Sequence, residues 1–151
     1  MYKKILVPLD GSSFSECILE HVKTISLGCA VPEVVLLRVI EPWSTQIYGI
    51  PESFQIEAQQ KVKDEARKSI AEVAKNLKKE GVSVALEVIE GKPDEVILNY
   101  AVNGEIDLIV MSTHGWSGIT RWVLGGTADR IVRHSPVPVL IASPEGCRVK
   151  S

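Results

Sequence analysis

Short apolar segments alternate with amphipathic helical segments along the chain, and this alternation restricts the fold more than any other feature. Residues 4–7 and 33–40 are apolar runs of the kind found in buried strands. Between them lies a stripe of apolar residues three or four positions apart: Phe14, Cys17, Ile18, Val22 and Ile25. This spacing predicts a helix that starts near Ser13 and ends near Gly28. A strand, a helix and a second strand in this order predict parallel pairing through a crossover helix.

The same alternation continues to the last strand. The further predicted elements are a long helix with one apolar stripe from Phe54 to Leu77, a strand at 82–89, a helix from Pro93, a strand at 107–111, a short helix to about His134 and a strand at 138–142. Polar residues alternate with apolar ones in the strand at 82–89, which favours a position at a sheet edge. We therefore predict an α/β three-layer sandwich, with a five-stranded parallel sheet in the order 3-2-1-4-5 and helices on both faces. The 151 residues suit one domain at 1–145, followed by a short tail at 146–151.

Composition and charge exclude several classes of function. Lys and Arg number 17 against 19 Asp and Glu, so the chain lacks the basic excess of a nucleic-acid-binding protein. No apolar run approaches the roughly 20 residues of a membrane span, and Pro8 interrupts the N-terminal apolar run that a signal peptide would need. The three cysteines are scattered and odd in number, which favours free thiols in a reducing compartment. We expect a cytoplasmic protein that neither inserts into membranes nor binds nucleic acid.

Two segments follow strands at the edge of the sheet where ligands bind in this architecture. The first runs from Pro8 to Ser13. The second runs from Ser112 to Thr127, contains four glycines and opens a helix. Glycines let backbone N–H groups approach an anion closely, and a helix start adds unpaired donors. The second segment therefore suits phosphate binding, although an ordinary glycine-rich turn accounts for the same residues.

Several known phosphate motifs do not match. The chain contains neither GxxxxGK[ST] nor a GxGxxG after the first strand, which disfavours a P-loop ATPase and a dinucleotide-binding site. The stretch DGSSFS lacks the double glycine of ATP pyrophosphatases. Asp10 stands almost alone at the strand ends, whereas a response-regulator receiver needs an acidic cluster there.

One family matches over nearly the whole chain. The segments PLDGS after the first strand, VI at the end of the second, and MSTHG followed by LGGTADRIVRHSPVPVLIA resemble the universal stress protein family. The nucleotide-binding branch of that family is marked by glycine, two residues, glycine, nine residues, and glycine with serine or threonine. The frame falls on Ser112, Gly115, Gly125 and Gly126 here. Ser112 therefore replaces the first glycine, and Gly126 takes the hydroxyl position, with Thr127 one residue later.

The resemblance implies a Rossmann-like fold of the adenine nucleotide alpha hydrolase-like type and a site for ATP, or for AMP or ADP. By this resemblance the adenosine end meets Pro8, Leu9 and Asp10, the base meets Val39, and Met111 packs against the base or ribose. The residues around the phosphates are Ser112, Gly115, Gly125, Gly126 and Thr127. His114 is a further contact from the same loop. Mg²⁺ or Mn²⁺ is held mainly by phosphate oxygens and by no metal site of the protein.

The leading functional hypothesis is an ATP-binding homodimeric regulator or sensor in the stress response. The last strand, from Val137 to Ala142, is apolar and lacks charged residues, so its open edge suits pairing with a second copy. The resemblance implies the same homodimer and leaves room for a regulatory protein partner. We predict no catalytic residue and at most slow hydrolysis, because His114 has neither a nucleophile nor an acidic neighbour in sequence.

Two alternatives stay open. Since Ser112 and Gly126 depart from the nucleotide motif, the chain can also be a nucleotide-free dimer that acts as an interaction module. A hydrolase or nucleotidyl-transfer enzyme on the same fold is the third hypothesis, and it would depend on His114 or Asp10.

Overall fold

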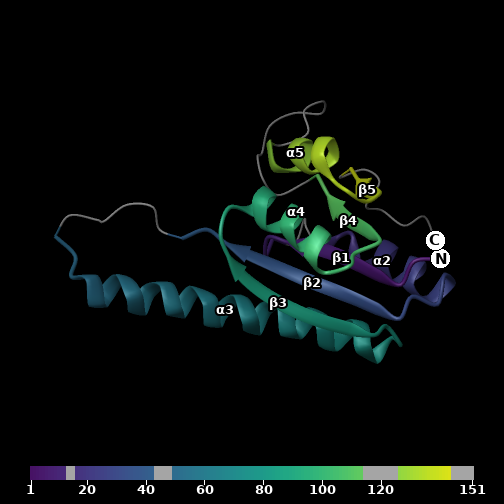
Figure 1. Ribbon diagram of the computed structural model, residues 1–151. Coiled ribbons are helices and arrows are strands. Elements are labelled where there is room, and N and C mark those ends of the chain that lie inside the picture. The colour runs from purple at the N-terminus through teal and green to yellow at the C-terminus, as the bar shows by residue number, and fades with distance from the viewer. Residues whose placement is uncertain (13–15, 43–48, 114–125, 144–151) are drawn as a thin grey trace.

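Strands and helices alternate strictly in the structure, a computed structural model that describes residues 1–12, 16–42, 49–113 and 126–143 (Figure 1). The elements are β1 (Lys4–Leu9), α2 (Leu19–Gly28), β2 (Glu33–Ile40), α3 (Glu52–Lys79), β3 (Val84–Glu90), α4 (Pro93–Asn103), β4 (Leu108–Ser112), α5 (Gly126–His134) and β5 (Val139–Ala142). The helix predicted from Ser13 is found from Leu19 onward, and its predicted first turn includes residues outside the described ranges.

The strands form one parallel sheet in the order β3-β2-β1-β4-β5, so the predicted α/β sandwich is confirmed. The expected edge position of β3 is confirmed as well. Three strands begin later than predicted: β3, β4 and β5. The amide of Val82 donates to the carbonyl of Leu77, which continues the turn after α3. The amide of Val137 donates to Ser135 Oγ, so this residue belongs to the turn before β5.

The helices cover the two faces of the sheet in pairs. Helices α2 and α3 lie on one face and α4 and α5 on the other (Figure 1). Side chains therefore alternate along each strand between two separate cores. In β1, Ile5 and Val7 pack toward α2 and α3, whereas Leu6 packs toward α4 and α5. Strand β4 is buried along its whole length, as the apolar run at 107–111 predicts for a strand covered on both faces.

Helix α3 is longer than the sheet that it covers. Its buried residues all lie in its second half: Ala66, Ile70, Ala74 and Leu77. Near its start, Phe54 is 62% exposed and Ile56 is 63% exposed. Figure 1 shows the first turns projecting beyond the ends of the strands. The predicted apolar stripe from Phe54 to Leu77 is therefore exposed at its start, because the first turns of α3 extend beyond the ends of the strands.

The cysteines do not match the expectation of free thiols throughout. Cys17 is disulfide-bonded, whereas Cys29 is free and exposed. Within the described ranges, no helix is both long and apolar enough to cross a membrane.

Candidate functional site

The direction of the chain reverses across the sheet between β1 and β4. From β1 the chain moves outward through β2 to β3, with α2 and α3 on one face. It then returns through α4 to β4, beside β1, and moves outward in the other direction to β5. The connections at the carboxyl ends of β1 and β4 therefore leave toward opposite faces. In parallel sheets of this type, the crevice outside such a pair of strand ends is the usual place for a ligand.

At the end of β1, Asp10 folds the chain into a tight turn. Its Oδ1 accepts hydrogen bonds from the Ser12 amide at 2.8 Å and from Ser12 Oγ at 2.6 Å. Aspartate side chains commonly build such turns by bonding the backbone two residues onward. Gly11 lies between them with φ +84°, a conformation that glycine adopts without the strain that other residues meet. The turn thus holds the Asp10 carboxylate at the edge of the crevice.

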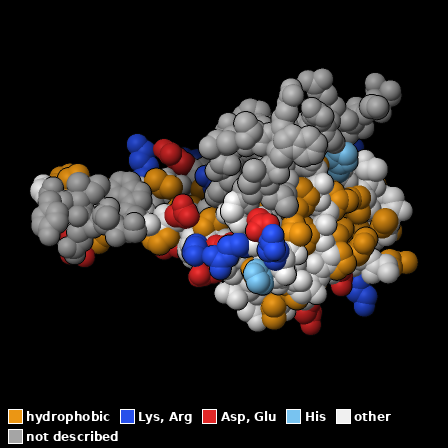
Figure 2. All heavy atoms as spheres, turned by 90° about the horizontal axis from the view of Figure 1, so that it is seen from above, with side chains coloured by type: hydrophobic (Ala, Val, Ile, Leu, Met, Phe, Trp, Pro, Cys, Tyr) orange, Lys and Arg blue, Asp and Glu red, His pale blue; other side chains and the backbone are white. Residues whose placement is uncertain are grey.

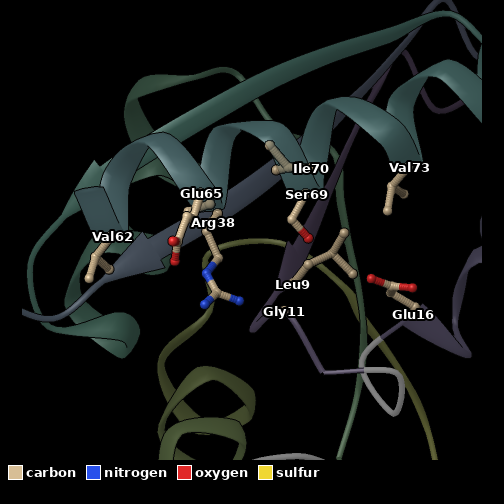
Figure 3. A pocket seen from close by; sticks show the side chains of 10 residues that line it. Leu9, Gly11, Glu16, Arg38, Val62, Glu65, Ser69, Ile70 and Val73 are labelled. Atoms are coloured by element: carbon tan, nitrogen blue, oxygen red, sulfur yellow. The ribbon is translucent and has the colours of Figure 1, made fainter. Parts of the chain in front are cut away.

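Arg38 borders this turn on the α3 side. In β2 it is paired in register with Leu9, and its side chain points into a cavity of about 190 Å³ between α3 and the end of β1 (Figure 3). Glu16 and Glu65 line the same cavity. The Arg38 Nε and Nη1 atoms are buried and make no hydrogen bond to any residue that the structure describes. Burial lowers the pKa of Arg38 from its ordinary value, and the nearby charge of Asp10 opposes that change.

The side of the crevice that faces α4 and α5 is apolar. Val39 and Met111 belong to the core on this face, together with Leu37. Val39 is 9% exposed and Met111 only 2% exposed. A base lying here would therefore meet mainly the backbone at the strand ends and little of the Met111 side chain. Ser112 is also buried and ends β4.

Helix α5 starts within the predicted phosphate segment. Gly126 is its first residue and is exposed, and Thr127 follows at the surface of the first turn. A Cβ placed on Gly126 would meet no atom of the described residues within 4 Å. Because α5 leads from the end of β4 to the start of β5, its N-terminus lies toward the carboxyl ends of the strands. The other loop residues predicted for the site, His114, Gly115 and Gly125, lie outside the described residues.

The structure therefore brings to one edge of the sheet those residues of the predicted site that it describes. Pro8, Leu9 and Asp10 come from the end of β1, and Val39 comes from the neighbouring β2. Gly126 and Thr127 come from the start of α5, the helix that leads away from β4.

Charges of both signs occur on the outer face above α4 and α5. In Figure 2, which looks onto the molecule from above, basic and acidic side chains lie next to one another, and hydrophobic side chains gather beside them. An ion pair joins Arg130 of α5 to the buried Asp94 of α4, with Nε and Oδ2 2.8 Å apart. Among the described residues, His, Cys, Asp and Glu form no group of three or more that could hold a metal ion.

Two residues at this edge were not predicted from the sequence. Arg38 is the one charged residue inside the apolar run VVLLRVI, and that contrast could have marked it as a residue with a particular environment. Asp94 directly follows Pro93 at a predicted helix start, where an acidic residue is common. Its pairing with Arg130 carries no signal in one sequence, because 36 positions separate the two residues.

Comparison with known proteins identifies the family of this architecture. The model of the universal stress protein family matches residues 1–143. The chain belongs to the universal stress protein family. Universal stress protein MJ0577 of Methanocaldococcus jannaschii is 31% identical over 154 residues, which cover 93% of this chain and 94% of that protein. The solved structure of MJ0577 superposes with a TM-score of 0.83 at 32% identity, covering 100% of this chain and 99% of the other.

Two universal stress proteins of lower identity share the fold and were solved with nucleotides. One, described as a complex with cAMP, is 21% identical, with a TM-score of 0.63 and coverage of 95% of this chain and 98% of the other. The other, from Arabidopsis thaliana with AMP bound, is 18% identical, with a TM-score of 0.62 and coverage of 93% and 91%. At these identities the likeness concerns the fold.

Proposed function

We propose that this universal stress protein binds an adenine nucleotide, ATP or else AMP or ADP, in the crevice between the ends of β1 and β4. The observation that carries the proposal is the arrangement around this crevice. The carboxylate of Asp10 is held at the end of β1 by Ser12, and the open first turn of α5 starts at Gly126. A carboxylate suits ribose hydroxyls, and a helix N-terminus suits phosphates.

The two ends of the nucleotide take different parts of the crevice in this proposal. The base lies against the backbone near Val39 and Met111, where the surroundings are apolar. The ribose lies beside Asp10, and the phosphates extend toward Gly126 and Thr127. Nucleotides bound to two other proteins of this fold show that the fold can accommodate the ligand class. Mg²⁺ or Mn²⁺ would be held mainly by the phosphate oxygens.

Calorimetric titration with Mg-ATP tests the proposal, after an unfolded sample has been checked for nucleotide that co-purifies. We expect micromolar binding that Asp10→Asn weakens, because the neutral amide is a poorer acceptor for ribose hydroxyls. Glu16→Gln is the matched control, since Glu16 lines the cavity on the other side of the turn. A nucleotide-free wild type that takes up no Mg-ATP would refute the proposal and favour the interaction module.

We also propose that the protein is a homodimeric regulator whose subunits pair through β5. In the described part of the chain, β5 pairs only with β4, so its outer edge offers backbone donors and acceptors to a second copy. Leu140 in this strand is 36% exposed. A stress-response role, the cytoplasmic location and a regulatory protein partner that reads the bound state belong to this proposal, as does the single domain at 1–145.

Light scattering during size-exclusion chromatography tests the dimer. Leu140→Lys is expected to give monomers, because a lysine on an exposed strand edge disfavours pairing with another strand. Val102→Lys places the same charge on an exposed site of α4 and should leave the dimer intact. A wild type that elutes as a monomer at micromolar concentration would contradict this part of the proposal.

A further inference from the structure

An ion pair connects the helix that begins at the proposed phosphate site to the helix beside it. Helices α4 and α5 pack against each other on one face of the sheet (Figure 1). Arg130 of α5 lies with its Nε 2.8 Å from Asp94 Oδ2 of α4. Asp94 is 2% exposed, whereas the Arg130 side chain is 51% exposed. A buried carboxylate thus meets a half-exposed cation that belongs to another element.

Arg130 supplies the positive charge paired with the Asp94 carboxylate. Asp94 Oδ2 is buried and makes no hydrogen bond within the described ranges, so its short contact with Arg130 is an ion pair without hydrogen-bond alignment. Buried charges are costly to leave unpaired, because the charged group has lost its water. Moving α5 relative to α4 would separate the pair, and the buried carboxylate therefore resists such a movement.

The second ion pair of α5 has no such effect. Arg133 pairs with Asp129 four residues earlier, and both side chains are exposed. This pair stays within α5 and connects it to nothing else. Among the ion pairs of the described residues, only the one between Asp94 and Arg130 joins α5 to another element.

The position of Arg130 along α5 relates this ion pair to the phosphate site. Gly126 and Arg130 are four residues apart, which is about one helical turn and about 6 Å along the axis. Ala128 and Ile131 are buried and fix the depth of the helix against the sheet. Apolar contacts alone permit small rotations and shifts, whereas an ion pair on one side of the helix selects one orientation.

We propose that Asp94 is a positioning residue that, through Arg130, aims the first turn of α5 at the phosphates of the bound nucleotide. This inference rests on the proposed function. Asp94 does not touch the ligand in this proposal. It acts by holding the backbone N–H groups near Gly126 and Thr127 in the direction in which they donate to phosphate oxygens.

The negative charge of Asp94 allows an electrostatic effect and a positioning effect to be distinguished by their sign. A negative charge near a phosphate site repels the ligand, so electrostatics alone predicts that Asp94→Asn strengthens Mg-ATP binding. Positioning predicts the opposite sign, because the neutral side chain holds Arg130 less firmly. Adenosine has no phosphate and lies at the other end of the crevice, so positioning predicts no change in its affinity.

The experiment is a calorimetric titration of wild type, Asp94→Asn and Asp129→Asn with Mg-ATP and with adenosine. Asp94→Asn should weaken Mg-ATP binding about tenfold, because the ion pair that fixes the orientation of α5 is lost, and should leave adenosine affinity unchanged. Asp129→Asn removes the same charge from the pair that stays within α5. Because Asp129 lies in the first turn of α5, its loss should leave Mg-ATP affinity equal to or tighter than that of wild type, and adenosine affinity unchanged.

Arg130→Gln and Arg133→Gln form a second matched set, which serves if Asp94→Asn does not fold. Only Arg130→Gln should weaken Mg-ATP selectively. Unchanged or tighter Mg-ATP binding in Asp94→Asn and Arg130→Gln overturns the inference, and so does an equal loss for adenosine. If the wild type binds neither ligand, the proposed function itself is refuted. If the wild type binds both ligands but the variants do not lose Mg-ATP affinity selectively over adenosine affinity, only the role of Asp94 is refuted.

Discussion

The guanidinium of Arg38 covers the backbone of Gly11, so that a Cβ at residue 11 would lie 2.8 Å from Arg38 Cζ. The contact joins β2 to the turn that holds Asp10. Two features disfavour a side chain at residue 11. A Cβ would overlap with the Arg38 side chain, which could move aside, and the φ of +84° is a conformation that residues with a side chain rarely adopt.

Gly11→Ala should lower the free energy of unfolding by about 1–2 kcal/mol, the cost of a left-handed conformation for a residue with a side chain. Gly28→Ala is the matched control, because a Cβ there meets no atom within 4 Å and Gly28 ends α2. The control should be neutral or slightly stabilising. Urea unfolding monitored by circular dichroism measures both, and equal changes in the two variants would contradict the argument.

Arg38→Met should raise the free energy of unfolding by about 1 kcal/mol, because folding buries Arg38 Nε and Nη1 without hydrogen bonds. Methionine keeps the length of the apolar stem and removes the donors. Arg67→Met serves as the control, since the side chain of Arg67 is 57% exposed and its contact with Asp64 measures 3.9 Å. If Arg38→Met loses stability instead, the attraction between Arg38 and Asp10 outweighs the cost of burial.

Gly126→Ser should tighten the binding of Mg-ATP about fivefold, which corresponds to one added hydrogen bond of about 1 kcal/mol. The substitution restores a hydroxyl at the motif position where this chain has glycine, and a Cβ there meets no atom within 4 Å. Gly126→Ala adds the Cβ without the hydroxyl and isolates the two effects. Titration calorimetry compares them, and an equal gain in both variants would exclude a role for the hydroxyl.

Asp107 should make stability depend on pH. Its Oδ2 accepts the amides of Lys3 at 2.7 Å and Lys4 at 2.9 Å, and these bonds lower the pKa of the carboxyl from its ordinary value of 3.8. A lowered folded-state pKa means that the contribution is complete above the unfolded value and is lost as pH falls through the folded value. Asp107→Asn should therefore destabilise at pH 7 and differ less from wild type as pH falls below 3.8.

Urea midpoints of wild type and Asp107→Asn across this range measure the effect. Asp64→Asn is the control, because the side chain of Asp64 is 55% exposed and its ion pair is long. A gap between wild type and Asp107→Asn that stays constant down to pH 2 would count against the bonds from Lys3 and Lys4 as the cause.

The sheet could be predicted from the sequence because its signals are local. Each strand is a short apolar run, each connection has helical spacing, and parallel pairing follows from their order. The helix α3 could be predicted from its stripe, but the exposure of its first turns could not, since the stripe from Phe54 onward is the same whether or not a sheet lies beneath it. How far a helix projects depends on the length of strands elsewhere in the chain.

Part of the candidate site could likewise be predicted from local sequence patterns, and part of it could not. Asp10 and the start of α5 could be predicted, because a turn residue after a strand and glycines before a helix are patterns of neighbouring residues. The contact of Arg38 with Gly11 and the pairing of Asp94 with Arg130 arise only when distant segments pack together. Spacing along the chain carries no information about either contact.

The two halves of helix α3 are stabilised to different extents. Its second half is held by buried side chains, whereas its first turns expose Phe54 and Ile56 and contact the sheet through the exposed bond of Gln59 to Glu90. A free helical segment of fewer than about 12 residues is marginal in water, because few bonds repay the cost of starting it. The turns before Val62 should therefore open and close while the rest of the protein stays folded, and their amide protons should exchange with solvent long before those of the turns from Ala66 onward.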